Sequence, residues 1–218
     1  DFQSLLSAVK ILISDKTLLV IENHYLGSVI DLKQFDTFYH EHPRTYSLNS
    51  FLEISKKLDC QLVDVKFPKR YGGNIRVIIS KGKTGVQDKL KLDAYEKYLS
   101  LEESFEDGLI ELQNFTAEWR VEKKIEIENL VKLHGRLPAK AFPGRAAILV
   151  KLLELDETHI SAVYEKPGSM KIGHYVPGTR IPIQSDEELF SQNPKIVINF
   201  AWHIKNEISS YLEENGLK

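Results

Sequence analysis

The sequence predicts an α/β protein built from two domains. In residues 5–12 apolar side chains recur at helical spacing, and the apolar run 18–21 that follows is typical of a strand buried on both faces. A helix that leads into such a strand indicates a parallel sheet. A second alternation of strands and helices begins after His134 and Gly135. Because 218 residues are enough for two cores, we assign the two alternations to two domains.

Residues 1–88 form the first predicted domain. Ser47 or Asn49 is placed to cap a helix that precedes two strand-like segments. These segments, 61–67 and 74–80, are separated by turn residues that include a pair of glycines. The pattern predicts an antiparallel hairpin added to an otherwise parallel sheet.

The polar stretch 81–88 and the helical stretch 89–133 connect the two domains. We interpret the first as a loop at the end of the first domain and the second as a helical linker. Large apolar side chains fall three or four residues apart along the linker, so we expect them to pack in a core. They are Phe105, Leu109, Leu112, Phe115 and Trp119.

Residues 134–218 form the second predicted domain, which is a small α/β domain. A strand, a tight turn, a helix and another strand make a βαβ unit at 139–142, 143–144, 145–155 and 160–164. A short helix, a buried strand and a closing helix follow at 186–190, 195–200 and 204–212.

Composition excludes several classes of function. The net charge of −2 gives no overall field that would attract nucleic acid or an anionic membrane, so we expect no nucleic-acid partner. No apolar run approaches the length of a membrane span. A single cysteine, Cys60, forms no internal disulfide, and the first residues do not resemble a signal peptide. We therefore expect a cytoplasmic protein.

The densest cluster of functional side chains is the segment 35–42, Phe-Asp-Thr-Phe-Tyr-His-Glu-His, with His24 and Tyr25 just beyond the first strand. Open α/β sheets bind ligands in the loops that leave the carboxyl ends of their parallel strands. A histidine oriented by a carboxylate, together with a tyrosine hydroxyl, suits abstraction of a proton next to a carbonyl. Two other interpretations remain open: a metal site at the last three residues of the segment, and histidines that make only structural hydrogen bonds.

The motifs 20–26, 35–42 and 72–77 resemble the second half of the methyltransferase domain of nucleotide-sugar C-methyltransferases, which add a carbon branch to deoxysugars. Residues 174–183 and the pair Ala201-Trp202 are similar to the second α/β domain of the same family, so the resemblance spans nearly the whole chain. The implied fold is part of a class I methyltransferase sheet with an antiparallel hairpin, then a helical linker and a second, Rossmann-like α/β domain.

The resemblance also implies the chemistry. His42 would correspond to the base that removes a proton from the sugar carbon beside a keto group, with Glu41 and Tyr39 assisting. The resulting enolate would attack the methyl group of S-adenosylmethionine. A positioned base typically contributes about a hundred- to ten-thousand-fold to such a step.

Further residues would bind the nucleotide-sugar substrate. His24 and Tyr25 would contact it, and the glycine pair Gly72 and Gly73 would let the hairpin backbone approach it closely, although a turn also favours glycine for its backbone geometry alone.

In the second domain, Arg145 stands where a cation and free N–H groups at a helix start would suit a pyrophosphate. Tyr175 and Trp202 would stack on a base or a sugar, and for all three residues a structural role is the alternative. The sequence departs from the family's pattern here, because residues 141–144 (Ala-Phe-Pro-Gly) replace a glycine-rich turn and Arg145 replaces a lysine.

The elements that hold S-adenosylmethionine in this fold, a glycine-rich loop and an acidic residue, are expected before the strand at Leu18, and this sequence has neither. A cysteine-rich zinc segment is also absent from it. We therefore expect a C-terminal portion of an enzyme that by itself binds neither S-adenosylmethionine nor a metal and transfers no methyl group. The alternative is a non-catalytic module that binds a nucleotide-sugar or a partner protein. Oligomeric state is not predicted.

Overall fold

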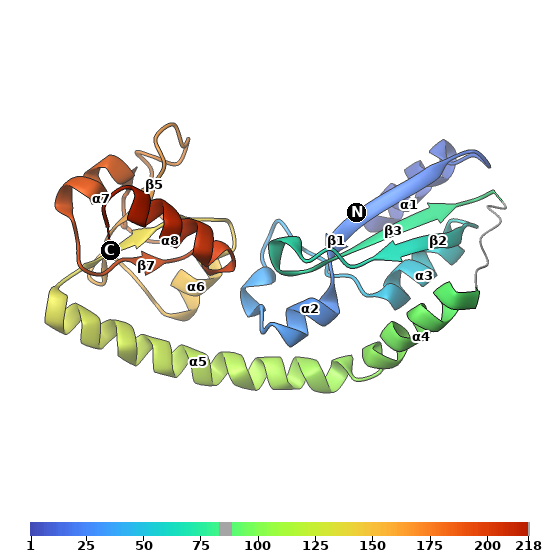
Figure 1. Ribbon diagram of the computed structural model, residues 1–218, viewed down its shortest axis with the longest axis horizontal. Helices are drawn as coiled ribbons and strands as arrows, with labels where there is room; N and C mark the ends of the chain where they lie inside the picture. The colour runs from blue at the N-terminus through green and yellow to red at the C-terminus, as the bar shows by residue number, and fades with distance from the viewer. Residues whose placement is uncertain (83–88, 218) are drawn as a thin grey trace. The chain divides into compact units, whose positions relative to one another are not determined.

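The computed structural model describes residues 1–82 and 89–217, without the side chains of 89–94, and it divides into two compact units (Figure 1). Unit 1 comprises residues 1–35 and 44–113, and unit 2 comprises residues 36–43 and 114–218. Most of the loop expected at 81–88 lies outside the described residues. The segment 36–43 belongs to unit 2 although residues of unit 1 flank it in the chain.

The sheet of unit 1 has three strands in the order β1-β3-β2 (Figure 1). They are β1 (Leu18–His24), β2 (Gln61–Lys66) and β3 (Asn74–Ser80), and β3 pairs antiparallel with both neighbours. The predicted hairpin of β2 and β3 is confirmed.

The prediction for the first strand is wrong in two respects. Among the described residues β1 pairs antiparallel with β3 and has no parallel partner. It is also not buried on both faces, since Leu18 and Val20 are 59% and 57% exposed. Leu19 and Ile21 alternate with them and pack against the core. A continuous apolar run can therefore form a strand of which only one face is buried.

The core of unit 1 joins this sheet to α1 (Phe2–Leu12) and α3 (Leu48–Lys57), and the short helix α2 (Leu26–Asp31) follows β1. Ser47 caps α3 as expected, because its hydroxyl accepts from the backbone N–H of Ser50 at 3.1 Å. The side chains of Phe51 and Val77 are fully buried in this cluster. The core thus joins α3 to the central strand β3.

Two helices occupy the stretch predicted to be helical, α4 (Lys89–Glu102) and α5 (Phe105–His134). Glu102 ties the end of α4 to the start of α3, because its carboxylate accepts from the backbone N–H groups of Leu48 and Asn49 at 2.6 and 2.9 Å. Of the apolar stripe, Leu112 is buried and Phe105 packs on the core of unit 1, whereas Leu109 is 39% exposed.

The sheet of unit 2 is wholly parallel, in the order β6-β5-β4-β7. Its strands are β4 (Leu137–Lys140), β5 (Ile160–Glu165), β6 (Ile183–Ser185) and β7 (Ile198–Asn199). Its helices are α6 (Ala146–Leu152), α7 (Asp186–Gln192) and α8 (Lys205–Glu214). The predicted βαβ unit, β4-α6-β5, is confirmed.

Two edge strands differ from the prediction. β6 was not expected, because three residues beside Pro182 carry too little periodicity to be recognised. The strand expected at 195–200 is reduced to β7, two half-buried residues that pair only with β4 among the described residues. An edge strand has one neighbour, so it is shorter and less buried than its apolar sequence suggests.

Among the helices of the described residues, none combines the length and the apolar character needed to cross a bilayer.

A carboxylate in β1 predicts how the stability of the protein depends on pH. Glu22 accepts hydrogen bonds from Asn74 Nδ2 at 2.8 Å, Arg76 Nε at 2.5 Å and Arg70 Nε at 2.7 Å. The bond from Asn74 and those from the two arginines lower the pKa of Glu22 from 4.5 to about 2. Because the folded pKa lies below the unfolded one, the stabilisation is complete above pH 4.5 and is lost as the pH falls toward 2.

We therefore expect Glu22→Gln to lower the melting temperature most near neutral pH and progressively less between pH 4.5 and 2. Thermal unfolding followed by circular dichroism at several pH values measures this. Glu118→Gln, at an exposed position on α5, is the matched control and should track the unsubstituted protein. A gap between Glu22→Gln and the parent that stays constant with pH contradicts the assignment.

Candidate functional site

The order of the strands in unit 2 reverses at β4. From β4 the chain moves outward to β5 and β6, and it then crosses to the other side of β4 to form β7. The strand order therefore reverses between the loops that leave the carboxyl ends of β4 and β7. We call this reversal the switch point, and it is where open α/β sheets bind their ligands. Phe142 and Phe200, one from each loop, meet edge to face at 6.5 Å.

The start of the segment 36–43 lies against these two loops. Arg145, from the loop after β4, donates to Asp36 through Nε at 2.8 Å and Nη2 at 2.5 Å, and Nη2 also donates to Thr37 Oγ1 at 3.0 Å. Trp202, from the loop after β7, donates its indole N–H to Asp36 Oδ2 at 2.7 Å. The guanidinium lies 5.0 Å from the centre of the Trp202 ring. Asp36 is thus held by both loops.

This ion pair is buried, with 7% of the Arg145 side chain and 1% of the Asp36 side chain exposed. A guanidinium that meets a carboxylate with two parallel bonds is a strong and directional contact. The pyrophosphate role expected for Arg145 is not tested by this geometry, but two of its N–H groups are directed at a carboxylate of the protein itself.

Tyr39, Glu41 and His42 lie together a few residues further on. The Tyr39 hydroxyl donates to Glu41 Oε2 at 3.2 Å, and the rings of Tyr39 and His42 are 5.0 Å apart. The backbone N–H of His42 donates to the Tyr39 carbonyl at 2.9 Å, so the segment forms a tight turn. Burial and then the bond to Glu41 raise the pKa of Tyr39, which keeps its hydroxyl protonated near neutral pH.

Gly144 lets this turn sit directly on the loop after β4. A Cβ at position 144 would lie 2.8 Å from Tyr39 Cε2 and 3.1 Å from Glu41 Oε2. Ala141, at the start of the loop, has φ of 61°, a left-handed conformation in which glycine is favoured. Ala141 thus adopts a backbone conformation that glycine adopts at little cost.

Sequence reasoning did not assign a role to His203, which follows Trp202. Burial, and then the charge of Arg145, lower the pKa of His203, so the ring is neutral near pH 7. Its Nδ1 is buried and has no hydrogen-bond partner among the described residues. No local pattern singles out this histidine, because its surroundings come from elements far apart in the chain.

The other expected site residues have different surroundings within their own units. Tyr175 is 62% exposed and forms a short antiparallel bridge with Pro182. His24 ends β1, and Tyr25 directly precedes α2 with only 3% of its surface exposed. The ring of Tyr25 meets the edge of Phe67 at 4.8 Å in the core of unit 1, and burial raises the pKa of its hydroxyl.

Gly72 and Gly73 both have positive φ, 87° and 106°. A Cβ at Gly72 would lie 2.3 Å from Gln34 Oε1, and one at Gly73 would lie 2.4 Å from Ser28 Oγ. Gln34 also donates to the Gly72 carbonyl at 2.5 Å. These glycines therefore let the hairpin backbone lie close to two side chains of unit 1, those of Gln34 and Ser28.

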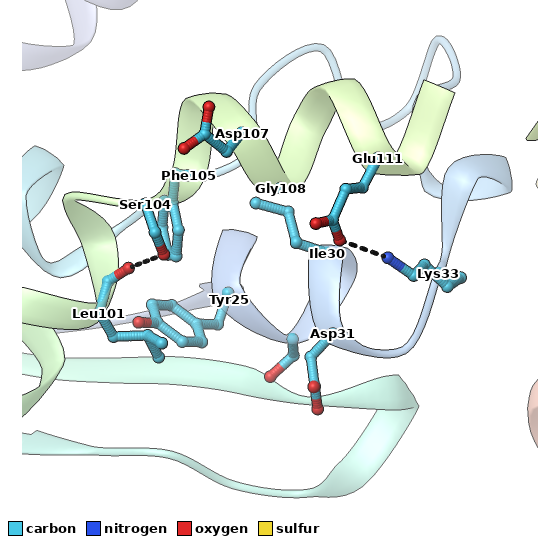
Figure 2. Close-up of a pocket in the computed structure, with 12 residues that line it drawn as sticks. Tyr25, Ile30, Asp31, Lys33, Leu101, Ser104, Phe105, Asp107, Gly108 and Glu111 are labelled. Carbon is cyan, nitrogen blue, oxygen red and sulfur yellow. Dashed lines mark hydrogen bonds and ion pairs between the residues drawn. The ribbon is translucent and has the colours of Figure 1, made fainter. Parts of the chain in front are cut away.

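Unit 1 contains an open cleft of about 810 Å³ beside α2 and the junction of α4 with α5 (Figure 2). Tyr25 is the predicted site residue that lines it. Lys33 and Glu111 form an ion pair of 3.6 Å across one end, and Gly108 brings α5 close to Ile30, where a Cβ would approach Cγ2 to 2.7 Å. The cleft holds acidic side chains but no histidine.

Neither a metal ion nor S-adenosylmethionine finds a matching set of side chains in the part of the chain that the structure describes. Within 1–82 and 89–217, no group of three or more His, Cys, Asp or Glu side chains is placed to hold a metal. In unit 2 the loop between β4 and α6 carries Ala141, Phe142 and Pro143 in place of a glycine-rich turn. This loop therefore does not fit S-adenosylmethionine, because these three positions lack the glycines that would let the backbone approach the cofactor closely.

Unit 2 is an open, parallel α/β domain, and a Tyr-His-Glu-His segment lies beside the switch point of its sheet. The family model for the C-methyltransferase C-terminal domain matches residues 69–216, and the chain belongs to this family. The chain is also 26% identical over 224 residues to the C-methyltransferase NovU of Streptomyces niveus. That match covers 99% of the chain and 52% of NovU, so the chain spans about half the length of this relative.

Proposed function

We propose that the complete protein is a C-methyltransferase that acts on a nucleotide-linked keto-deoxysugar, and that His42 is the base of the reaction. The family match supports C-methyl transfer. The observation that carries the proposed mechanism is the contact of Tyr39, Glu41 and His42 in one turn beside the switch point of the parallel sheet.

Each residue of this turn has a chemical role in the proposal. The imidazole of His42 takes the proton from the carbon next to the keto group, and the electron pair of the broken C–H bond moves into an enolate. Tyr39, whose raised pKa keeps it protonated, donates a hydrogen bond, and Glu41 accepts from it and orients it. Carbon becomes a nucleophile only after this deprotonation, so the base controls the step.

S-adenosylmethionine would supply the methyl group when bound by the complete protein. The proposal places no residue of this chain in that binding site. His24 and Tyr25, Gly72 and Gly73 stay candidates for substrate contacts in unit 1, and Trp202 and Tyr175 stay candidates in unit 2. Of these, Trp202 is 36% exposed while it bonds to Asp36, so part of its ring is accessible.

Proton abstraction can be tested without methyl transfer. We expect the full-length protein in D₂O, incubated with a panel of nucleotide-linked keto-deoxysugars and no S-adenosylmethionine, to exchange the hydrogen beside the keto group for deuterium in one of them. Mass spectrometry and proton NMR measure the exchange. The matching alcohol, made by reduction of the keto group, should not exchange because its C–H bond is not acidic.

With S-adenosylmethionine added, the same substrate should gain one methyl group on that carbon. A ligand that raises the melting temperature yet shows neither exchange nor methylation would instead support a non-catalytic module that binds nucleotide-sugars.

A further inference from the structure

The contacts of the segment 36–43 suggest how its reactive end is held. This inference rests on the proposed function, because it concerns the same turn. Asp36 is 1% exposed and accepts three hydrogen bonds, two from Arg145 and one from Trp202. The partners are 109 and 166 residues away in the chain. Such a carboxylate is fixed in both position and orientation.

The fixed point is connected to the reactive side chains by a short stretch of backbone. Thr37 accepts from Arg145 through its hydroxyl, and its carbonyl accepts from the backbone N–H of Tyr39 at 3.1 Å. The Tyr39 carbonyl in turn accepts from the backbone N–H of His42 at 2.9 Å. A displacement of Asp36 would therefore be passed to Tyr39 and His42 through two consecutive turns.

A second contact, made by Gly144, restricts the position of the turn that carries Tyr39 and Glu41. Gly144 lies against Tyr39 and Glu41 and is adjacent to Arg145, so the loop after β4 both supports the turn and supplies the cation that holds its start. The Trp202 ring, which the guanidinium faces at 5.0 Å, completes the arrangement from the loop after β7. The two loops of the switch point thus act on one segment.

We propose that Arg145 and Trp202 are positioning residues, which clamp Asp36 and thereby hold Tyr39, Glu41 and His42 in the geometry that proton transfer requires. The two loops at which such sheets bind ligands here both donate hydrogen bonds to an acidic side chain of the protein itself. Arg145 then contributes to catalysis through the segment 36–43 and does not contact the substrate phosphates.

The test uses conservative variants of the full-length protein. Arg145→Lys keeps the charge but loses the planar pair of bonds, and Trp202→Phe keeps a ring but loses the N–H. In both we expect kcat for deuterium exchange and methyl transfer to fall about tenfold to a hundredfold, since small displacements of a reacting group have effects of this size. KM for the nucleotide-sugar should stay within about threefold of the parent value, because Arg145 does not bind it and phenylalanine at position 202 keeps a ring that can still contact it. Arg136→Lys, at an exposed position before β4, is the matched control and should leave both constants unchanged.

The double variant Asp36→Leu/Arg145→Met separates positioning from stability. An apolar pair of similar size often maintains the stability of a buried ion pair, so we expect a melting temperature close to that of the parent. Its kcat should still be reduced, because the directional bonds are gone. Parent-like turnover in this double variant would overturn the proposal, and so would a rise in KM without a change in kcat in Arg145→Lys.

Hydrogen–deuterium exchange of the backbone amides in 36–43 gives a readout that needs no activity. We expect faster exchange in Arg145→Lys and Trp202→Phe than in the parent and in Arg136→Lys. If the parent protein shows no activity but this difference is found, the proposed function fails while the clamp stands. Equal exchange in all four proteins would show that no clamp exists.

Discussion

Replacement of His42 by asparagine in the full-length protein is expected to lower deuterium exchange and methyl transfer about a hundred- to ten-thousand-fold, which is the usual contribution of a positioned base. Asparagine is close in size to histidine and can donate a hydrogen bond, but it cannot take a proton. The ring centres of Tyr39 and His42 are 5.0 Å apart, and asparagine can fill much of the same space, so the packing of position 42 against Tyr39 should largely persist. Affinity for the nucleotide-sugar, measured by calorimetry, should change little.

His40 provides a matched control two residues away. Its side chain is 81% exposed, and its Nε2 lies 4.0 Å from Glu41 Oε1, at the outer limit of an ion pair. His40→Asn should therefore retain turnover within about threefold of the parent, since an exposed side chain that is not the base contributes little. If His42→Asn turns over like the parent, His42 is not the base. A large loss in His40→Asn together with a small one in His42→Asn would transfer the role to His40.

Replacement of Lys140 by methionine is expected to lower the free energy of unfolding by about 3–5 kcal/mol. Lys140 ends β4, and its Nζ lies 2.6 Å from Asp186 Oδ2 at the start of α7, with 2% and 1% of the two side chains exposed. Tyr211 donates to the same oxygen at 2.9 Å, but Asp186 Oδ1 is buried without a hydrogen-bond partner among the described residues. Without the lysine, the carboxylate would stay buried and uncompensated. Chemical denaturation of the chain measures the loss.

Removal of both charges should restore most of this stability. In Lys140→Met/Asp186→Leu no charge remains in the core, so we expect unfolding within about 1–2 kcal/mol of the parent. Lys123→Met is the surface control, because Lys123 pairs with Glu126 at 2.6 Å with 45% and 56% of the side chains exposed. It should change stability by less than about 0.5 kcal/mol. A Lys140→Met protein as stable as the Lys123→Met protein would contradict the buried-pair argument.

The buried ion pairs Lys140–Asp186 and Arg145–Asp36 both have their cation near the end of β4, but they connect it to different parts of unit 2. Both cations lie at or just after the carboxyl end of β4, where Lys140 is the last residue of the strand and Arg145 follows five residues later. Lys140 connects the sheet to α7, so its effect is expected on stability. Arg145 connects the loop to the segment that carries His42, so its effect is expected on turnover.

Much of the architecture could be predicted from local patterns. The cap at Ser47, the hairpin 61–80, the long helical stretch and the βαβ unit after Gly135 are each encoded by residues close in the chain. The edge strands β6 and β7 could not be predicted well, because their length depends on a neighbouring strand. The exposed side chains of Leu18 and Val20 likewise depend on what covers the sheet.

The residue types of the candidate site were also visible in the sequence, since the segment 35–42 and its resemblance to C-methyltransferases required only the order of residues. The side chains that surround this segment in the folded protein could not be predicted from the sequence. The 29 basic and 31 acidic side chains allow many pairings, and no local pattern selects Asp36 with Arg145 or Lys140 with Asp186.

By itself, then, the sequence determined the α/β class, most of the helices and strands and the family to which the chain belongs, because short-range periodicity and an ordered motif encode them. Only the tertiary structure decided that 36–43 belongs to unit 2, that Arg145 faces a carboxylate of the protein and that Tyr25 is a core residue. The physical reason is that burial and ion pairing are made between segments distant in the chain. They exist only once the parallel sheet has brought its two switch-point loops together.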